Sequence, residues 1–142
     1  TYFERFPGIR TYMDRMTRQV RAEGFVTTIF GRKVHIPAAQ GRSQAERSFG
    51  DRAAINAPIQ GAAADVMRRA MIRMPQALRD AGLSARMLQV HDELIFEAPE
   101  AEADAVIAVA RRIMERAAEP ALSISVPLVV EARAAANWDD AH

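Results

Sequence analysis

Residues 88–97 read Leu-Gln-Val-His-Asp-Glu-Leu-Ile-Phe-Glu, two short apolar runs that meet at three polar residues. Such runs joined by a short polar break are typical of a β-hairpin. The tip of this hairpin would be His91-Asp92-Glu93. Tight hairpin turns favour glycine because they need positive φ angles, and this tip contains none. We therefore expect the residues of this tip to be present for the chemistry of their side chains rather than for the geometry of the turn.

The carboxylates of the predicted tip are candidate ligands of a divalent cation. Mg²⁺ takes one or two protein carboxylates and completes its shell with substrate phosphates. A hairpin anchored in a core would hold such a carboxylate rigidly, and we expect Asp92 to supply it. The alternative is that Asp92 and Glu93 are ordinary solvated turn residues.

Composition limits the class of protein. The 142 residues, 49% hydrophobic and 26% charged, suit one globular domain of ordinary size. The absence of cysteine excludes disulfides and thiolate metal sites. No apolar run is as long as a membrane span and no signal segment opens the chain, so we expect a cytoplasmic protein with no membrane partner. The first residue is Thr1 rather than Met, which indicates a piece of a longer protein.

Charge changes sign along the chain. Residues 1–52 carry 10 Arg or Lys and 5 Asp or Glu, a net charge of +5, whereas residues 97–142 carry 4 and 9, a net charge of −5. A basic first third suits a surface that binds phosphates. Solvated helix faces are an equally good explanation of the charge.

The first third predicts a helix and then a second hairpin. The helix ends near Gly24, a typical C-cap residue. Its apolar residues recur at helical spacing: Ile9, Met13, Met16 and Val20. Strands are predicted over residues 25–30 and 33–36, joined by a turn at Gly31-Arg32. Arg32 and Lys33 are candidate contacts to nucleic-acid phosphates, or else charges that protect an edge strand from aggregation.

After a predicted loop over residues 38–45, the longest helical pattern runs from about Glu46 to Asp80. We expect Pro58 to bend this helix rather than end it, because the apolar stripe continues past it. The predicted buried stripe consists of Ile55, Ile59, Ala63, Val66, Ala70 and Met74.

A polar ridge is predicted on another side of this helix. Arg52, Asn56 and Gln60 are spaced i, i+4 and i+8, and the small residues 61–64 follow them. Every base pair of duplex DNA presents acceptors in the minor groove, so a row of donors can bind a paired duplex of any sequence. The alternative is an ordinary exposed polar face.

The last third predicts a helix near residues 103–117 and a strand over residues 123–132. Two hairpins, this C-terminal strand and the long helices predict an α+β fold, with one antiparallel sheet and helices packed on one of its faces. The other face would be open to a substrate, and the 91–93 tip would lie on it.

Five ordered blocks of this sequence resemble the family A DNA polymerases. They are Tyr2-Phe-Glu-Arg-Phe-Pro-Gly8, Gly24-Phe-Val-Thr-Thr-Ile-Phe-Gly-Arg32, Arg52-Ala-Ala-Ile-Asn-Ala-Pro-Ile-Gln-Gly61, Gln89-Val-His-Asp-Glu-Leu-Ile-Phe-Glu97 and Asn137-Trp138. The resemblance covers nearly the whole chain. It implies the C-terminal part of a polymerase domain, with residues 1–24 as a helix at the base of the fingers and residues 25–142 as a polymerase palm.

The resemblance also implies roles for single residues. Asp92 matches the palm aspartate that binds both catalytic Mg²⁺ ions, and Glu93 matches its acidic neighbour, which supports the metal site less directly. The residues that match DNA contacts are His91 at the primer end, Arg32 near the primer backbone, and Arg52, Asn56 and Gln60 near the nascent base pair.

The implied activity is templated extension of a primer 3′-hydroxyl with deoxynucleoside triphosphates (dNTPs) in DNA replication and repair. Mg²⁺ would be the cofactor and primer-template DNA the partner, since two metal ions about 3.5–4 Å apart neutralise the charge that develops in phosphoryl transfer. The family's other metal-binding aspartate and its nucleotide-binding finger helix would precede Thr1. We therefore expect the 142 residues alone to be inactive, and the full protein to act in the cytoplasm at the nucleoid.

Two other functions stay open at this point. A domain that keeps the palm fold and binds DNA without catalysis fits the single matched aspartate. A metal-dependent nuclease would need further carboxylates near Asp92, and Glu97 and Glu100 would lie down the strand from the tip.

Overall fold

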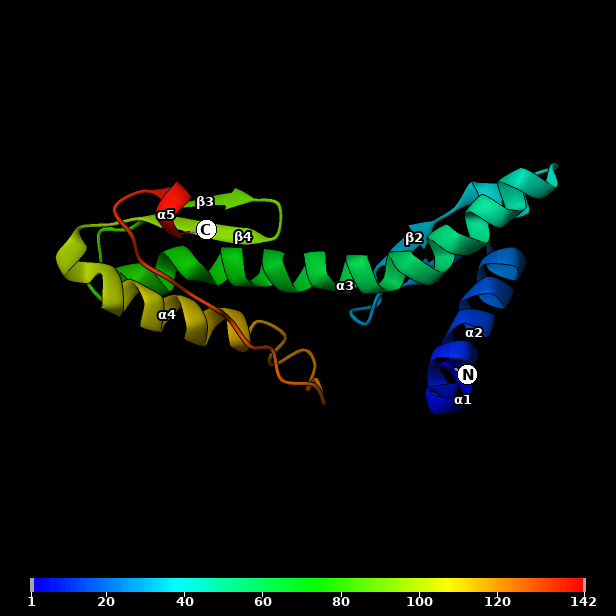
Figure 1. Cartoon of the computed structure of the whole chain (residues 1–142), viewed down its shortest axis with the longest axis horizontal. Coiled ribbons are helices and arrows are strands. Elements are labelled where there is room, and N and C mark those ends of the chain that lie inside the picture. Colours follow the sequence, from blue (N-terminus) through cyan, green and yellow to red (C-terminus); the bar gives the residue numbers. More distant parts are fainter. Residues whose placement is uncertain (1, 142) are drawn as a thin grey trace. The chain divides into compact units, whose positions relative to one another are not determined.

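A 37-residue helix, α3 (Gln44–Asp80), connects two β-hairpins in the chain (Figure 1). The structure, a computed structural model, describes residues 2–141. The hairpins are β1 (Phe25–Thr27) with β2 (Lys33–His35), and β3 (Arg86–Val90) with β4 (Glu93–Glu97). The predicted α+β class is confirmed. The predicted single sheet is wrong, because the described residues form two separate two-stranded antiparallel sheets.

The chain divides into two compact units, the first ending at Ala63 and the second beginning at Ala64. Besides β1, β2 and the start of α3, the first unit contains α1 (Tyr2–Arg5), α2 (Pro7–Glu23) and the 3-10 helix η1 (Pro37–Gln40). The second contains the rest of α3, β3, β4, η2 (Glu100–Glu102), α4 (Ala103–Glu115) and α5 (Trp138–Ala141). The assignment of residues 1–24 to the fingers and 25–142 to the palm stays a prediction.

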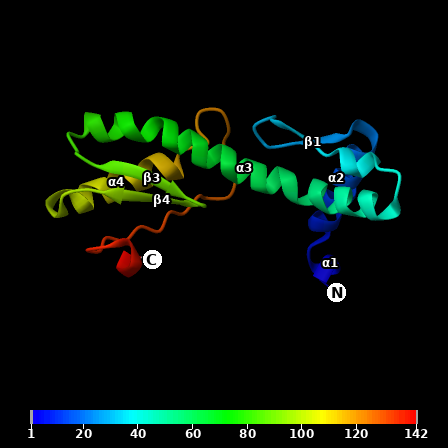
Figure 2. The same cartoon turned by 90° about the horizontal axis from the view of Figure 1, so that it is seen from above.

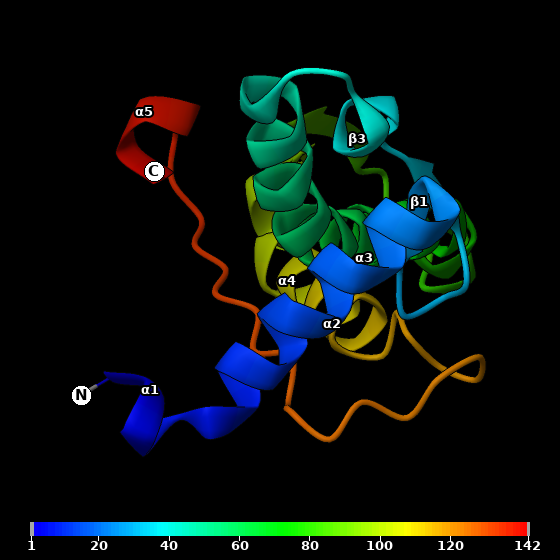
Figure 3. The same cartoon turned by 90° about the vertical axis from the view of Figure 1, so that its right-hand side faces the viewer.

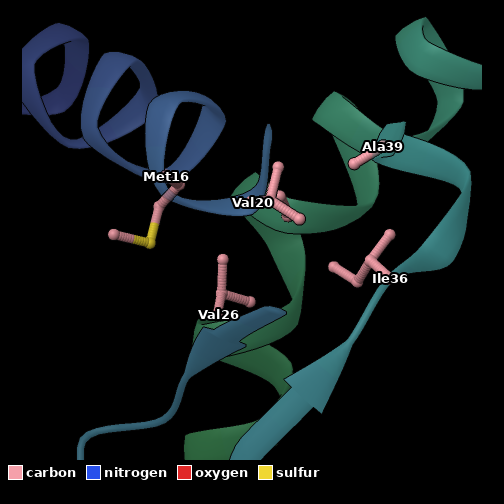
Figure 4. Packing of buried hydrophobic residues seen from close by; sticks show 6 residues of the cluster. Met16, Val20, Val26, Ile36 and Ala39 are labelled. Carbon is pink, nitrogen blue, oxygen red and sulfur yellow. The ribbon is translucent and has the colours of Figure 1, made fainter. Parts of the chain in front are cut away.

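Side chains from α2, β1, η1 and α3 meet in the core of the first unit (Figure 4). The buried residues of this core are Met16, Val20, Val26, Ile36, Ala39 and Ala54. Gly24 ends α2 with a φ of 76°, and its N–H donates to the carbonyl of Val20 at 2.9 Å, which confirms the predicted C-cap. Figure 3 shows α1 as a separate short helix ahead of α2.

Helix α3 buries smaller side chains in its first half than the sequence predicts. Ala54 is fully buried, whereas Ile59 of the predicted stripe is 58% exposed. The physical reason is a close backbone approach, since a Cβ added to Gly50 would lie 2.3 Å from the backbone nitrogen of Ala39. A larger side chain does not fit at Gly50, and Ile59, nine residues later, lies on the opposite side of the helix. In the second half the prediction holds for Ala70 and Met74, which are buried, whereas Val66 is half-buried and Ala63 is exposed.

Helix α3 begins two residues earlier than predicted because a capping box starts it. The hydroxyl of Ser43 accepts a hydrogen bond from the Glu46 N–H at 3.1 Å, and the Glu46 carboxylate accepts one from the Ser43 N–H at 2.9 Å. The helix continues through Pro58, which confirms that this proline does not end it. The Ser-x-x-Glu pattern at residues 43–46 is the signal that would have predicted this start.

The second unit packs α3 and α4 against one face of the β3–β4 hairpin (Figure 1). Its buried residues are Met74 and Leu78 of α3 and Val106, Val109 and Ala110 of α4, with Met87, Leu94 and Phe96 of the hairpin against them. The helical cover of one hairpin face is therefore as predicted. Among the described residues, no helix is both long and apolar enough to cross a lipid bilayer.

The predicted strand over residues 123–132 is absent from the structure. These residues follow α4 as an irregular trace (Figure 2), and Val126 and Val129 are 66% and 78% exposed. The segment has the composition of a strand, but a strand also needs a neighbouring backbone to pair with. Within residues 2–141 no strand pairs with it. The β-forming composition of residues 123–132 is therefore not enough to make them a strand.

Gly50→Ala should destabilise the chain by about 1–3 kcal/mol, because the added methyl group meets the backbone of Ala39. Gly8→Ala is the matched control: Gly8 is also helical, but no atom lies within 4 Å of its added Cβ. That substitution should stabilise the chain by about 0.5–1 kcal/mol, because alanine loses less backbone entropy in a helix. Urea unfolding measures the change in the free energy of unfolding for both variants. Equal changes in the two variants would contradict the close approach at Gly50.

The capping box should make stability depend on acid pH. The hydrogen bonds from Ser43, that of its backbone N–H first, lower the pKa of Glu46 below its ordinary value. A carboxylate with a depressed folded-state pKa stabilises the fold above its unfolded pKa and loses that effect as pH falls through the folded pKa. Glu46→Gln should therefore lower stability at pH 7 and leave it nearly unchanged at acid pH, as measured by urea unfolding at both.

Candidate functional site

The β3–β4 hairpin turns at two residues, His91 and Asp92. Val90 pairs with Glu93, so Glu93 is the first residue of β4. The prediction that Glu93 belongs to the tip is therefore wrong. His91 has a φ of 52°, in the left-handed region. Glycine is the usual residue where a hairpin turn needs a positive φ, so a histidine here strains the backbone.

The hairpin is anchored by one of its faces only. Met87, Leu94 and Phe96 pack against the core of the second unit, whereas Leu88 is 61% exposed. Only one face can pack in this way, because successive side chains of a strand point to opposite faces. At the tip, the side-chain amide of Gln89 donates to the carbonyl of His91 at 3.1 Å.

Asp92 presents a carboxylate that is available to a ligand. Its side chain is exposed and makes no hydrogen bond or ion pair with the described residues, while Glu93 beside it is half-buried. Two adjacent carboxylates fit the share of a Mg²⁺ shell that protein supplies when phosphates complete it. No group of three or more His, Cys, Asp or Glu side chains in residues 2–141 could hold a metal ion by itself.

The predicted ridge is present on α3. Arg52, Asn56 and Gln60 lie four residues apart on one continuous helix, and all three are exposed. Their side chains form no hydrogen bond or ion pair within the described part of the chain. The ridge therefore offers its donors to an external partner.

The β1–β2 loop differs from its prediction. The turn lies at residues 29–30, where the Gly31 N–H donates to the Thr28 carbonyl at 2.9 Å, and not at Gly31-Arg32. Gly31 adopts a φ of 81°, so it serves as the left-handed residue that closes the loop. Loop and turn lengths depend on this backbone geometry, which the apolar pattern does not reveal.

Arg32 and Lys33 follow this turn and are both exposed. A terminal nitrogen of Arg32 donates to the carbonyl of Gly61 at 3.1 Å, and the Lys33 ammonium lies 4.4 Å from the centre of the Phe25 ring. A Cβ on Gly61 would lie 2.6 Å from the methyl carbon of Thr28. The small residue after Gln60 therefore lets the loop between β1 and β2 approach α3 closely.

Two further contacts beside the ridge were not predicted. Arg21 of α2 forms an ion pair with Asp51, with its Nε donating to Oδ1 at 2.9 Å, and this pairing raises the pKa of Arg21. The hydroxyl of Tyr12 donates to the carbonyl of Ile55 at 2.8 Å, and burial raises the pKa of Tyr12. The partners are 30 and 43 positions apart, so no local pattern could reveal them.

The candidate residues fall into two sets. Arg32, Lys33, Arg52, Asn56 and Gln60 lie in the first unit, and His91, Asp92 and Glu93 lie in the second. Within the first set, Arg32 contacts α3 next to Gln60 through its hydrogen bond to Gly61, and Lys33 contacts Phe25.

The sequence model of "DNA polymerase family A" matches residues 1–140. The chain belongs to this family. It is 53% identical to DNA polymerase I of Rhizobium leguminosarum over 144 aligned residues and 46% identical to that of Pseudomonas aeruginosa over 142. In each case the match covers 99% of this chain, but it spans only 14% and 15% of the length of the two relatives.

A solved structure supports the same family and fold. The polymerase domain of Pol1 from M. smegmatis, in complex with DNA primer-template and dNTP, matches with a TM-score of 0.80 and 42% identity. The match covers 89% of this chain and 22% of that chain. The α+β fold of this family A chain is therefore that of a segment of a polymerase domain.

Relief of the strain at His91 should be measurable as stability. His91→Gly and His91→Ala both remove the imidazole, but only glycine adopts a φ of 52° without cost. The glycine variant should be more stable than the alanine variant by about 1–2 kcal/mol in urea unfolding. Equal stability of the two variants would show that the turn changes conformation when the imidazole is lost.

Proposed function

We propose that this family A chain is part of a DNA-templated DNA polymerase that extends a primer 3′-hydroxyl with dNTPs. The observation that carries the proposal is the unpartnered, exposed carboxylate of Asp92 on a strained, two-residue hairpin turn. Primer-template DNA and dNTP are the partners, as in the complex of the M. smegmatis relative. The protein would act in the cytoplasm, at the nucleoid.

In this proposal Asp92, with Glu93 in support, holds the Mg²⁺ ions of the reaction. When bound, two such ions neutralise the charge on the entering and leaving oxygens of nucleotidyl transfer. The chain's part is to fix the carboxylate: Gln89 holds the turn through the carbonyl of His91, and the buried face of the hairpin keeps both strands in place. His91 would contact the primer end from the same turn.

The first unit would bind the duplex. Asn56 and Gln60 offer side-chain amide donors to the minor-groove acceptors that every base pair presents, and Arg52 adds a cation on the same ridge. Arg32 and Lys33 would lie near the phosphates of the primer strand. Binding of this kind depends on correct pairing rather than on sequence.

A chimera tests the proposed function. The matching segment of R. leguminosarum DNA polymerase I is replaced by these 142 residues, and templated, Mg²⁺-dependent primer extension is measured. Asp92→Ala should reduce the rate at least about 100-fold, because several kcal/mol of charge stabilisation depend on the metal. Glu93→Ala should cost less, and Glu100→Ala, an exposed acid on η2, should have no effect.

The same assay separates the alternatives. Equal rates for Asp92→Ala and Glu100→Ala would overturn the metal assignment. A chimera that binds primer-template DNA but extends nothing would favour a non-catalytic DNA-binding domain. We expect the 142 residues alone to give no incorporation.

A further inference from the structure

Three side chains of the first unit hold α3 at positions next to the ridge. The pairs are Arg21 with Asp51, Tyr12 with the carbonyl of Ile55, and Arg32 with the carbonyl of Gly61. Each position held on α3 is the direct sequence neighbour of a ridge residue, namely Arg52, Asn56 or Gln60. The three contacts are called the α3 anchors below.

The anchors constrain rotation of α3 about its axis. The first and last positions held on α3, Asp51 and Gly61, are ten positions apart, which is about 15 Å at the rise of an α-helix. Arg21 and Tyr12 come from α2, whereas Arg32 comes from the β1–β2 loop, so two different elements hold the helix. A helix held at three heights from two elements cannot turn without breaking at least one hydrogen bond or ion pair.

Small rotations would matter for a ridge that reads base edges. Side chains extend about 5–6 Å from a helix axis, so a rotation of about 20° displaces their ends by about 2 Å. Hydrogen bonds tolerate only a few tenths of an ångström around their normal length. A ridge that turned this far would lose its bonds to a correctly paired duplex.

Gly61 makes the third anchor possible. The Arg32 guanidinium would lie 3.1 Å, and the Thr28 methyl carbon 2.6 Å, from a Cβ at this position. A side chain there would displace the Thr28 methyl group and the Arg32 guanidinium from their places against α3. The absence of a side chain directly after Gln60 therefore brings the loop close enough for Arg32 to bond the helix backbone.

We propose that Tyr12, Arg21 and Arg32 are positioning residues that set the rotation of α3 and so aim Asn56 and Gln60 at the minor groove of the primer-template duplex. The inference rests on the proposed function. It adds residues that act through the helix, so their loss should weaken the ability to distinguish paired from mispaired primer ends. A merely stabilising role would lower the melting temperature and leave that discrimination unchanged.

The test uses the chimeric polymerase described above and compares extension of matched and mismatched primer ends. Tyr12→Phe removes only the hydroxyl that bonds Ile55, and Thr11→Val is its control because the Thr11 hydroxyl bonds Pro7 within α2. Arg21→Ala removes the ion pair, and Arg18→Ala is its control because Arg18 bonds Asp14 of its own helix.

Gly61→Ala tests the third anchor without removing the charge of Arg32, which is itself a predicted DNA contact. Each of the three anchor variants should reduce the ratio of matched to mismatched extension about fivefold, the effect of one net hydrogen bond. The two controls should stay near the wild-type ratio. Asn56→Ala and Gln60→Ala supply the reference loss.

The outcomes separate two failures. A wild-type chimera that extends no primer overturns the proposed function and this inference together. In the other case the wild-type chimera extends primers and its Asn56→Ala and Gln60→Ala variants lose discrimination. If the anchor variants then keep discrimination, the positioning role alone is overturned. All assays are run well below the melting temperature of each variant. If Arg21→Ala does not fold, the discrimination of Tyr12→Phe and of Gly61→Ala tests the positioning role.

Discussion

The close approach of the α3 backbone to the segments before it is the contact on which the first unit depends. At Gly50 the helix meets the backbone of Ala39, and at Gly61 it meets the loop between β1 and β2. Both contacts require a residue without a side chain. In the first unit this inner face of α3 buries Ala54, whereas Ile59 and the ridge residues Arg52, Asn56 and Gln60 are exposed. The ridge lies on the part of the helix surface that this packing leaves exposed.

The hairpin of the second unit shows a different balance between stability and function. Its buried face fixes the two strands, while its tip holds a histidine in a backbone conformation better suited to glycine. Strain of this kind persists only where the surrounding structure maintains it. Here the paired strands and the Gln89 hydrogen bond maintain it, so the carboxylate of Asp92 stands at a fixed place.

Local patterns predicted several elements well. The C-cap at Gly24, the β3–β4 hairpin, the exposed ridge and the helix after residue 102 all follow from turn chemistry and hydrophobic periodicity, which act over a few residues. The start of α3 was missed although its capping-box pattern is also local. The prediction of the buried stripe failed in the first half of α3 for another reason. Hydrophobic periodicity carries no information on how near another backbone comes to the helix.

The sequence by itself determined the class of the fold, the chemistry of the residues at the hairpin tip and the polar row on the long helix, since each depends on spacing along one segment. Only the tertiary structure decided that residues 123–132 have no strand partner among the described residues, that Glu93 begins β4 and that three anchors hold α3. These outcomes depend on hydrogen bonds and packing between segments distant in the chain. Local periodicity cannot specify such contacts, because the free energy that selects them arises only when the segments meet.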